Sequence, residues 1–240
     1  MKNFKNTIQI SLIVLLSNLF LASFAYAQVE HDVELDSWQK KIAVADIKTD
    51  LDLLYDGLMK AHPDLFIHRS KAEYDVFYEH MQAQIKTSMS LFETQVMYQR
   101  FAAYGNVAHS KIDFPEAVYD DFRERGGKIF PLYIRIVEGR TFISENYSIN
   151  SGIQLGDELI AINGLDTQAW LTRTAQNISA DTSYIAHSLL EFLFNKYLWL
   201  ELGEQDRFSV TIKTQEDEIK SFSVDAASRQ DMQKAAKNQP

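Results

Sequence analysis

A short strand bracketed by two glycines lies near the middle of the chain, where residues 155–164 read LGDELIAING. The run 157–162 has the length and apolar content of a β-strand. The Asn-Gly dipeptide at 163–164 accepts positive φ and is typical of a tight turn. We therefore predict a strand over 157–162 that ends in this turn, and we expect further strands on either side of it.

Runs of β-type sequence stand both before and after this strand. Residues 130–137 and 140–144 are separated by a Glu-Gly break of hairpin size. Residues 208–213 and 219–224 alternate apolar and polar side chains around an acidic turn, which predicts a second hairpin. A helix is expected over 167–176. The pattern predicts a β-region of several short strands with inserted helices.

A strongly apolar helix is expected before the last hairpin. Asp181 can cap this helix, which runs through about Leu200 with hydrophobic residues on nearly every face. Such a helix is usually buried, so we interpret its aromatic residues as core rather than as a binding groove. Where it lacks cover, it would expose an apolar patch that favours a partner or self-association.

The first half of the chain has the periodicity of helices. Apolar residues recur every three or four positions from Ile42 and predict a helix that stops before Pro63. Two capping boxes, Ser70–Glu73 and Ser90–Glu93, each begin a further amphipathic helix. We expect Gly105 to take the left-handed conformation that ends the last of these helices. These patterns together predict a unit of three helices in the first half of the chain.

The predicted fold class is α+β, with a change of periodicity beyond Pro115 that separates two parts. An N-terminal three-helix domain is expected at 28–120 and the β-domain with inserted helices at 121–227. The last residues, 228–240, are polar, and we expect them to fray.

The N-terminus has the features of a cleaved signal peptide over residues 1–27. Two lysines precede a mostly apolar run, and Ala25-Tyr26-Ala27 places small residues where a signal peptidase reads them. Removal of this segment takes away two lysines and no acid, so the 24 basic residues become 22 against 33 acidic ones, a charge of −11. We expect an exported protein, periplasmic or secreted, without a stable membrane span after cleavage.

Composition and motifs exclude several classes of partner and cofactor. The 240 residues carry a formal charge of −9 and no basic cluster, which argues against nucleic-acid binding. The sequence has no cysteine, and its six histidines make no recognised metal-binding spacing. Signatures of phosphate-cradling and dinucleotide-binding loops are missing too. We therefore predict neither a metal nor another cofactor.

Several motifs together resemble the tail-specific, or C-terminal processing, serine peptidases of the tricorn-core-like type. The stretches 62–66 (HPDLF), 89–93 (MSLFE) and 105–110 (GNVAHS) are similar to the N-terminal part of that family. The stretch 130–133 (FPLY) together with 155–164 is similar to the PDZ-like domain that follows it, and this resemblance implies a small β-barrel or sandwich with inserted helices. The order of the parts matches, and the resemblance covers roughly residues 45–225.

The resemblance implies a catalytic role for His109, which follows the helix-ending turn at 105–106. The family usually has Gly-Asp-Gly-His-Thr here, whereas this chain has Asn106-Val107-Ala108-His109-Ser110. In the family the nucleophilic serine lies in an α/β core after the PDZ-like domain, and this chain ends where that core would begin. Because His109 alone cannot carry out acyl transfer, we expect little or no catalysis in isolation.

A second candidate site is the glycine-containing loop Gly126-Gly127-Lys128-Ile129-Phe130. Its glycines could free backbone N–H groups to converge on a peptide carboxylate, and Lys128 adds positive charge. Two functions follow from these observations. In the first, the chain is the exported N-terminal and PDZ-like portion of a tail-specific serine peptidase that recognises peptide or protein C-termini. It is then either a truncated reading frame or one piece of a split enzyme whose serine lies on a separate catalytic chain. Alternatively, it is a stand-alone peptide-binding module without activity.

Overall fold

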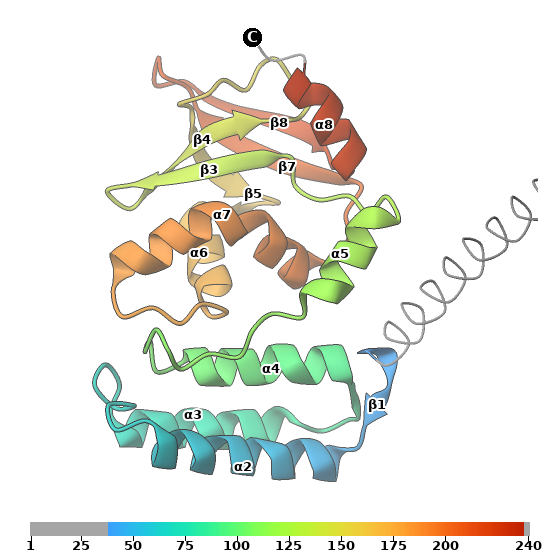
Figure 1. Ribbon diagram of the computed structural model, residues 1–240. Coiled ribbons are helices and arrows are strands. Elements are labelled where there is room, and N and C mark those ends of the chain that lie inside the picture. Colours follow the sequence, from blue (N-terminus) through green and yellow to red (C-terminus); the bar gives the residue numbers. More distant parts are fainter. Residues whose placement is uncertain (1–37, 238–240) are drawn as a thin grey trace, which may run out of the picture.

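The computed structural model describes residues 38–237 and shows an α+β protein, which confirms the predicted fold class. Three helices form the lower part in Figure 1, and a twisted sheet with further helices against it forms the upper part. The predicted signal peptide, residues 1–27, lies outside the described residues.

The lower part contains the three predicted helices, α2 (Val44–Ala61), α3 (Lys71–Gln84) and α4 (Leu91–Ala103). Both predicted capping boxes are present at the starts of α3 and α4. In each, the serine side chain accepts a hydrogen bond from the glutamate N–H, and the glutamate side chain accepts one from the serine N–H. A two-residue ladder between β1 (Lys41–Ile42) and β2 (Met89–Ser90) joins the start of α2 to the start of α4.

The end of α4 differs from the prediction for Gly105. The residue with left-handed backbone is Asn106, at φ 54°, and not Gly105. Gly105 is needed for another reason, because a Cβ atom there would lie 2.7 Å from the Tyr74 hydroxyl oxygen. Asn tolerates the left-handed region, so it can make the turn while the glycine lets the helices approach.

The three helices enclose an aromatic core. Tyr74 and Phe101 are fully buried, and their rings contact each other edge-to-face with centroids 5.7 Å apart. Tyr55 stacks on Tyr74 at 5.6 Å. Burial raises the pKa of Tyr74 to about 12. These rings come from all three helices, so their packing holds the helical unit together.

The upper part contains a mixed-length antiparallel sheet in the order β3-β4-β5-β7-β8, with β6 (Leu165–Asp166) paired to β5. The main strands are β3 (Leu132–Val137), β4 (Arg140–Asn146), β5 (Glu158–Ile162), β7 (Arg207–Lys213) and β8 (Ile219–Asp225). Both predicted hairpins are present, and the turn after β5 has left-handed Asn163 and Gly164. An isolated bridge between Ile129 and Ala227 joins the two ends of the sheet, which gives it a barrel-like curvature.

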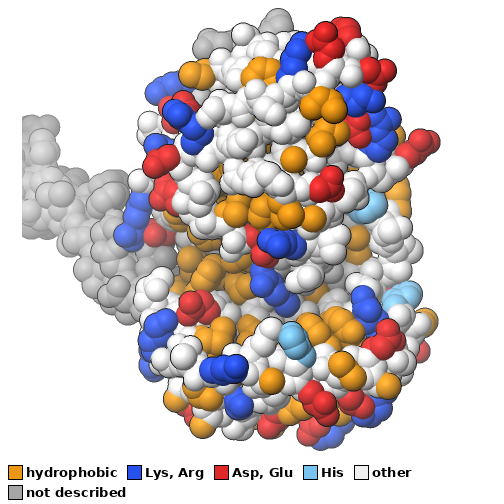
Figure 2. Space-filling model, turned by 180° about the vertical axis from the view of Figure 1, so that it is seen from behind, with side chains coloured by type: hydrophobic (Ala, Val, Ile, Leu, Met, Phe, Trp, Pro, Cys, Tyr) orange, Lys and Arg blue, Asp and Glu red, His pale blue; other side chains and the backbone are white. Residues whose placement is uncertain are grey.

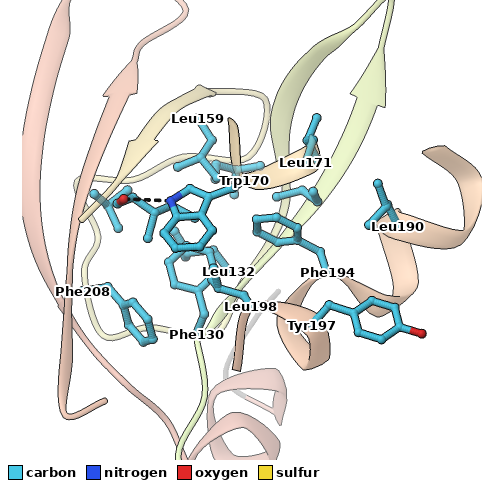
Figure 3. Close-up of a cluster of buried hydrophobic side chains, with 14 of the residues drawn as sticks. Phe130, Leu132, Leu159, Trp170, Leu171, Leu190, Phe194, Tyr197, Leu198 and Phe208 are labelled. Carbon is cyan, nitrogen blue, oxygen red and sulfur yellow. Dashed lines mark hydrogen bonds between the residues drawn. The ribbon is translucent and has the colours of Figure 1, made fainter. Parts of the chain in front are cut away.

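Helices α6 (Thr167–Ala175) and α7 (Ser183–Leu202) cover the inner face of the sheet. Figure 3 shows Phe194 and Leu198 of α7 beside Phe130 and Leu132 of the sheet region, and Leu190 belongs to the same buried cluster. The Trp170 indole donates a hydrogen bond of 2.9 Å to the Ile162 carbonyl, so its only polar atom is satisfied in the core. This arrangement confirms that α7 belongs mainly to the core.

Local details of α7 differ from the prediction. Its N-cap is Thr182, whose side chain accepts a hydrogen bond from the Ile185 N–H, and not Asp181. Asp181 instead accepts a hydrogen bond of 3.1 Å from the Ala108 N–H in the lower part. Both residues are good N-caps, so the long-range contact decided which one caps the helix.

The C-terminal residues form a helix instead of a frayed tail. The prediction for 228–240 is wrong for α8 (Arg229–Lys237), which begins with hydrogen bonds between Ser228 and Asp231. Met232 is the buried residue of this short helix and packs against Ile129 and Ala227. One buried side chain leaves almost no periodic signal, so a polar composition concealed the helix. Helix α5 (Glu116–Glu124) was not predicted either.

Candidate functional site

The free edge of β3 lies against α7. Among residues 38–237, β3 pairs with β4 and with no other strand. The Ile136 N–H donates a hydrogen bond of 2.7 Å to the Glu191 carboxylate of α7. At the other end, the Asn195 side-chain amide donates one of 2.9 Å to the Phe130 carbonyl. Side chains of α7 therefore satisfy backbone groups of this edge at both of its ends.

The predicted loop 126–130 lies immediately before β3, where it ends α5. Gly126 has φ 90°, and its N–H donates to the Arg123 carbonyl. The Gly127 N–H donates to the Phe122 carbonyl at 2.9 Å. These two bonds are the Schellman motif that commonly ends helices. The two glycines therefore terminate α5 and do not form the nest of free N–H groups that we predicted.

The remaining donors of the loop are bound as well, but in two different ways. The Ile129 N–H donates to the Ala227 carbonyl within the bridge that joins the sheet ends. The Lys128 N–H donates a hydrogen bond of 3.1 Å to the Glu204 carboxylate, just after α7. The Lys128 ammonium group lies 3.7 Å from Asp206. In this structure the backbone and side chain of Lys128 therefore contact carboxylates of the same chain.

His109 lies on an exposed turn between the two parts of the molecule. It has no hydrogen bond with any other residue in the range 38–237, whereas its neighbours do. The Ala108 N–H contacts Asp181, and the Ser179 hydroxyl donates 2.5 Å to the Val107 carbonyl. The adjacent Ser110 is buried, and its hydroxyl has no partner within the described residues. The turn is anchored by its neighbours, whereas the His109 side chain is exposed.

Sequence reasoning missed a large cavity between α4 and the upper helices. Its volume is about 850 Å³, within the range of ligand sites, and its walls include Met97, Phe92 and Leu200. Figure 2 shows this side of the molecule, where hydrophobic side chains line a hollow between the two parts and Lys or Arg side chains lie near it. Arg100 lines the cavity and is held by Glu201 at 2.5 Å and by Asn177 at 3.0 Å. Its residues come mainly from α3 and α4 in the lower part and from α6 and α7 in the upper part, so no local pattern indicates it.

The predicted apolar patch on α7 is present near the N-terminal end of the helix. Tyr184 and Phe192 are 79% and 80% exposed, and Ile185 and Leu189 are each 39% exposed. Ile185, Leu189 and Phe192 lie three or four residues apart and therefore share one face. Leu190 and Phe194 on another face are buried in the core, so α7 packs on one side and exposes apolar area on another.

Neither a metal centre nor a membrane-spanning helix was found in the part of the chain that the structure describes. No three His, Asp or Glu side chains within residues 38–237 gather in a way that could hold a metal ion. Over the same residues, no helix is long and apolar enough to cross a membrane.

Comparisons with known proteins place the upper part of the chain in a family. Two structures of the chlamydial protease CPAF in its mature form, one with lactacystin, are similar at TM-score 0.49 and 16% identity. The similarity covers 76% of this chain but 35% and 34% of those chains, so this chain spans about a third of their length. No curated protein matches it in sequence. Residues 127–234 match the PDZ domain family, so the sheet with its helices, from β3 into α8, forms a PDZ domain.

Proposed function

We propose that this protein binds extended peptides by adding them as a strand to the free edge of β3. Domains of the PDZ type bind peptide C-termini in this way, through backbone hydrogen bonds at a sheet edge. The observation that carries the proposal is the edge itself, because β3 is unpaired on one side and its Ile136 N–H reaches a side-chain acceptor there. Such an acceptor can be exchanged for a peptide carbonyl without breaking the sheet.

The terminal carboxylate of the peptide is proposed to bind at the loop 126–130, on the Lys128 N–H. This amide is the donor of the loop that bonds a side chain, Glu204, while its neighbours bond backbone carbonyls. A ligand carboxylate can therefore replace Glu204 at modest cost, and the Lys128 ammonium group would add attraction. The glycines Gly126 and Gly127 support the loop by ending α5.

Calorimetric titration with peptides tests this proposal. Random-sequence decapeptides with free C-termini are compared with the same peptides amidated at the C-terminus. Tighter binding of the free carboxylate, weakened by Lys128→Gln, is the expected result. Equal binding of the two forms, or none, would overturn recognition of C-termini. Lys111→Gln, which changes an exposed lysine paired with Asp113 in the lower part, is the matched control.

A second proposal is that the chain is the N-terminal and PDZ portion of a tail-specific serine peptidase, with the nucleophilic serine on another polypeptide. The motifs at 62–66, 89–93 and 105–110 support it, because they occur in the family's order before the PDZ domain. His109 would then be the candidate base, exposed on its turn and accessible to a second chain. Export to the periplasm or exterior, after cleavage before Gln28, forms part of this proposal.

The DNA downstream of the Pro240 codon provides the first test of the peptidase proposal. A reading frame that encodes a serine-containing α/β segment would support a split or truncated enzyme, whereas its absence would favour the stand-alone module. In a peptide-cleavage assay we expect no activity from the chain alone. Cleavage abolished by His109→Ala would show instead that the chain carries its own nucleophile.

A further inference from the structure

The contact between Glu191 and β3 involves the same backbone group that an added strand would need. Within an antiparallel pair, alternate residues direct their N–H and C=O groups to the neighbouring strand, and the residues between them direct theirs outwards. The Ile136 N–H donates to Glu191 and therefore points away from β4. Ile134, two residues earlier on the same strand, points the same way. A peptide strand on β3 would pair with these two residues.

A peptide and the Glu191 carboxylate cannot bind Ile136 together. A backbone N–H is a single donor, and the distance of 2.7 Å is already that of a complete hydrogen bond. An added strand lies about 4.8 Å from its neighbour and would occupy the volume that the Glu191 side chain now fills. We propose that Glu191 is a gate on the peptide site, which an incoming peptide carbonyl must displace. This inference rests on the proposed peptide-binding function.

The helix itself holds its place while the gate opens. Leu190 and Phe194, on either side of Glu191 in the sequence, are 1% and 0% exposed in the core of the PDZ domain. Withdrawal of α7 would expose these side chains and leave a void, which is far more costly than one rotamer change. Glu191 is half-buried, so part of its side chain already contacts solvent. The gate is therefore a side-chain movement.

The displaced carboxylate also selects among peptides. After rotation Glu191 stays beside the peptide residue that pairs with Ile136, because α7 does not move. An acidic side chain there would meet a like charge, and a lysine or arginine would meet an opposite one. The other titratable groups close by in sequence are His187, one turn earlier on α7, and Arg135 and Glu138 on and after β3. The preferred ligands are extended peptides with a basic residue at that position.

Three variants test whether Glu191 competes with peptides for the Ile136 N–H. Glu191→Ala removes the acceptor, Glu191→Gln keeps the shape but loses the charge, and Glu138→Gln removes an exposed charge near the same edge without touching Ile136. Each protein is titrated with one peptide carrying Lys or Glu at the paired position. We expect Glu191→Ala to bind the Glu peptide about tenfold more tightly than the wild type, because both the competing acceptor and the like charge are removed, with Glu191→Gln in between. The preference for Lys over Glu should shrink in both Glu191 variants but not in Glu138→Gln.

Hydrogen exchange of the Ile136 amide tests the contact without any peptide. Exchange should be at least tenfold faster in Glu191→Ala than in the wild type, and unchanged in Glu138→Gln. Equal peptide affinities in all four proteins would overturn the gate and leave the proposed function standing. If none of the proteins bound peptide, both would be overturned. If Glu191→Ala unfolded, Glu191→Gln would decide, because its shape fills the same space.

Discussion

The helical unit and the PDZ domain are built on different kinds of core. In the helical unit the core residues lie between Ile47 and Phe101, on helices whose apolar faces are regular. In the PDZ domain they range from Phe114 to Ala226 and come from strands, helices and the loops between them. The first core is the sum of local patterns, whereas the second requires distant segments to meet. The two parts should therefore respond differently to the same kind of change.

The largest expected effect comes from removing one buried ring from each core. Phe101→Ala and Phe194→Ala should each lower the free energy of unfolding of their own part by about 3–5 kcal/mol, because both rings are fully buried. Urea unfolding would be followed in a Trp38→Phe background, so that fluorescence reports Trp170 and Trp199 in the PDZ domain. Circular dichroism would report both parts.

Phe101→Ala and Phe194→Ala should shift different unfolding transitions, one seen by circular dichroism and the other by fluorescence. Phe101→Ala should shift the circular dichroism transition more than the fluorescence transition, because Phe101 belongs to the helical core, whereas Trp170 and Trp199 belong to the other core. Phe194→Ala should shift fluorescence. If Phe101→Ala moved both transitions equally, the two cores would unfold as one unit and the comparison would fail.

An intermediate effect is expected from alkaline pH on the aromatic core. Tyr74 is fully buried and its hydroxyl has no hydrogen-bond partner within the described residues, so burial raises its pKa to about 12. The unfolded chain ionises this tyrosine near pH 10, so stability is intact below pH 10 and falls as the pH rises towards 12, by up to about 3 kcal/mol. Tyr74→Phe should be less sensitive over this range in urea unfolding. Tyr184→Phe, at an exposed position, should behave as the wild type.

The smallest effects are expected at the helix caps. Ser70→Ala removes half of a capping box in the helical unit, and Gly126→Ala forces a side chain into positive φ at the end of α5. Each should lower the free energy of unfolding by about 1 kcal/mol. Gly126→Ala should leave peptide affinity within about twofold, because its N–H bonds Arg123. A large loss of affinity with unchanged stability would restore the glycine to the binding site.

Much of the fold could be predicted because its signals are short in range. Capping boxes at Ser70 and Ser90, the Asn163-Gly164 turn and both hairpins all depend on residues within a few positions of one another. The errors share a cause. Thr182 caps α7 because Asp181 bonds Ala108, more than seventy residues away, and α8 forms because Met232 finds Ile129. No window of sequence contains these pairs.

The candidate site divides in the same way. The sequence indicated that α7 would leave apolar area exposed, and this area is present at Tyr184 and Phe192, whereas the binding of a peptide carboxylate at Lys128 stays a prediction. It could not indicate the partner of either Lys128 or Ile136. Glu191 is one of two acidic residues in the apolar helix α7, and its hydrogen bond depends on the strand that this helix faces in the folded chain.

By itself the sequence determined the α+β class, the three helices, the order of the hairpins and the resemblance that led to a PDZ domain. These follow from periodicity and turn chemistry, which act between neighbours along the chain. Only the tertiary structure decided which acceptor each backbone N–H group of the candidate site binds. The loop amides of 126–129 and the edge amide of Ile136 are all occupied, two of them by carboxylates from distant residues, because every backbone donor takes the nearest acceptor that folding brings to it.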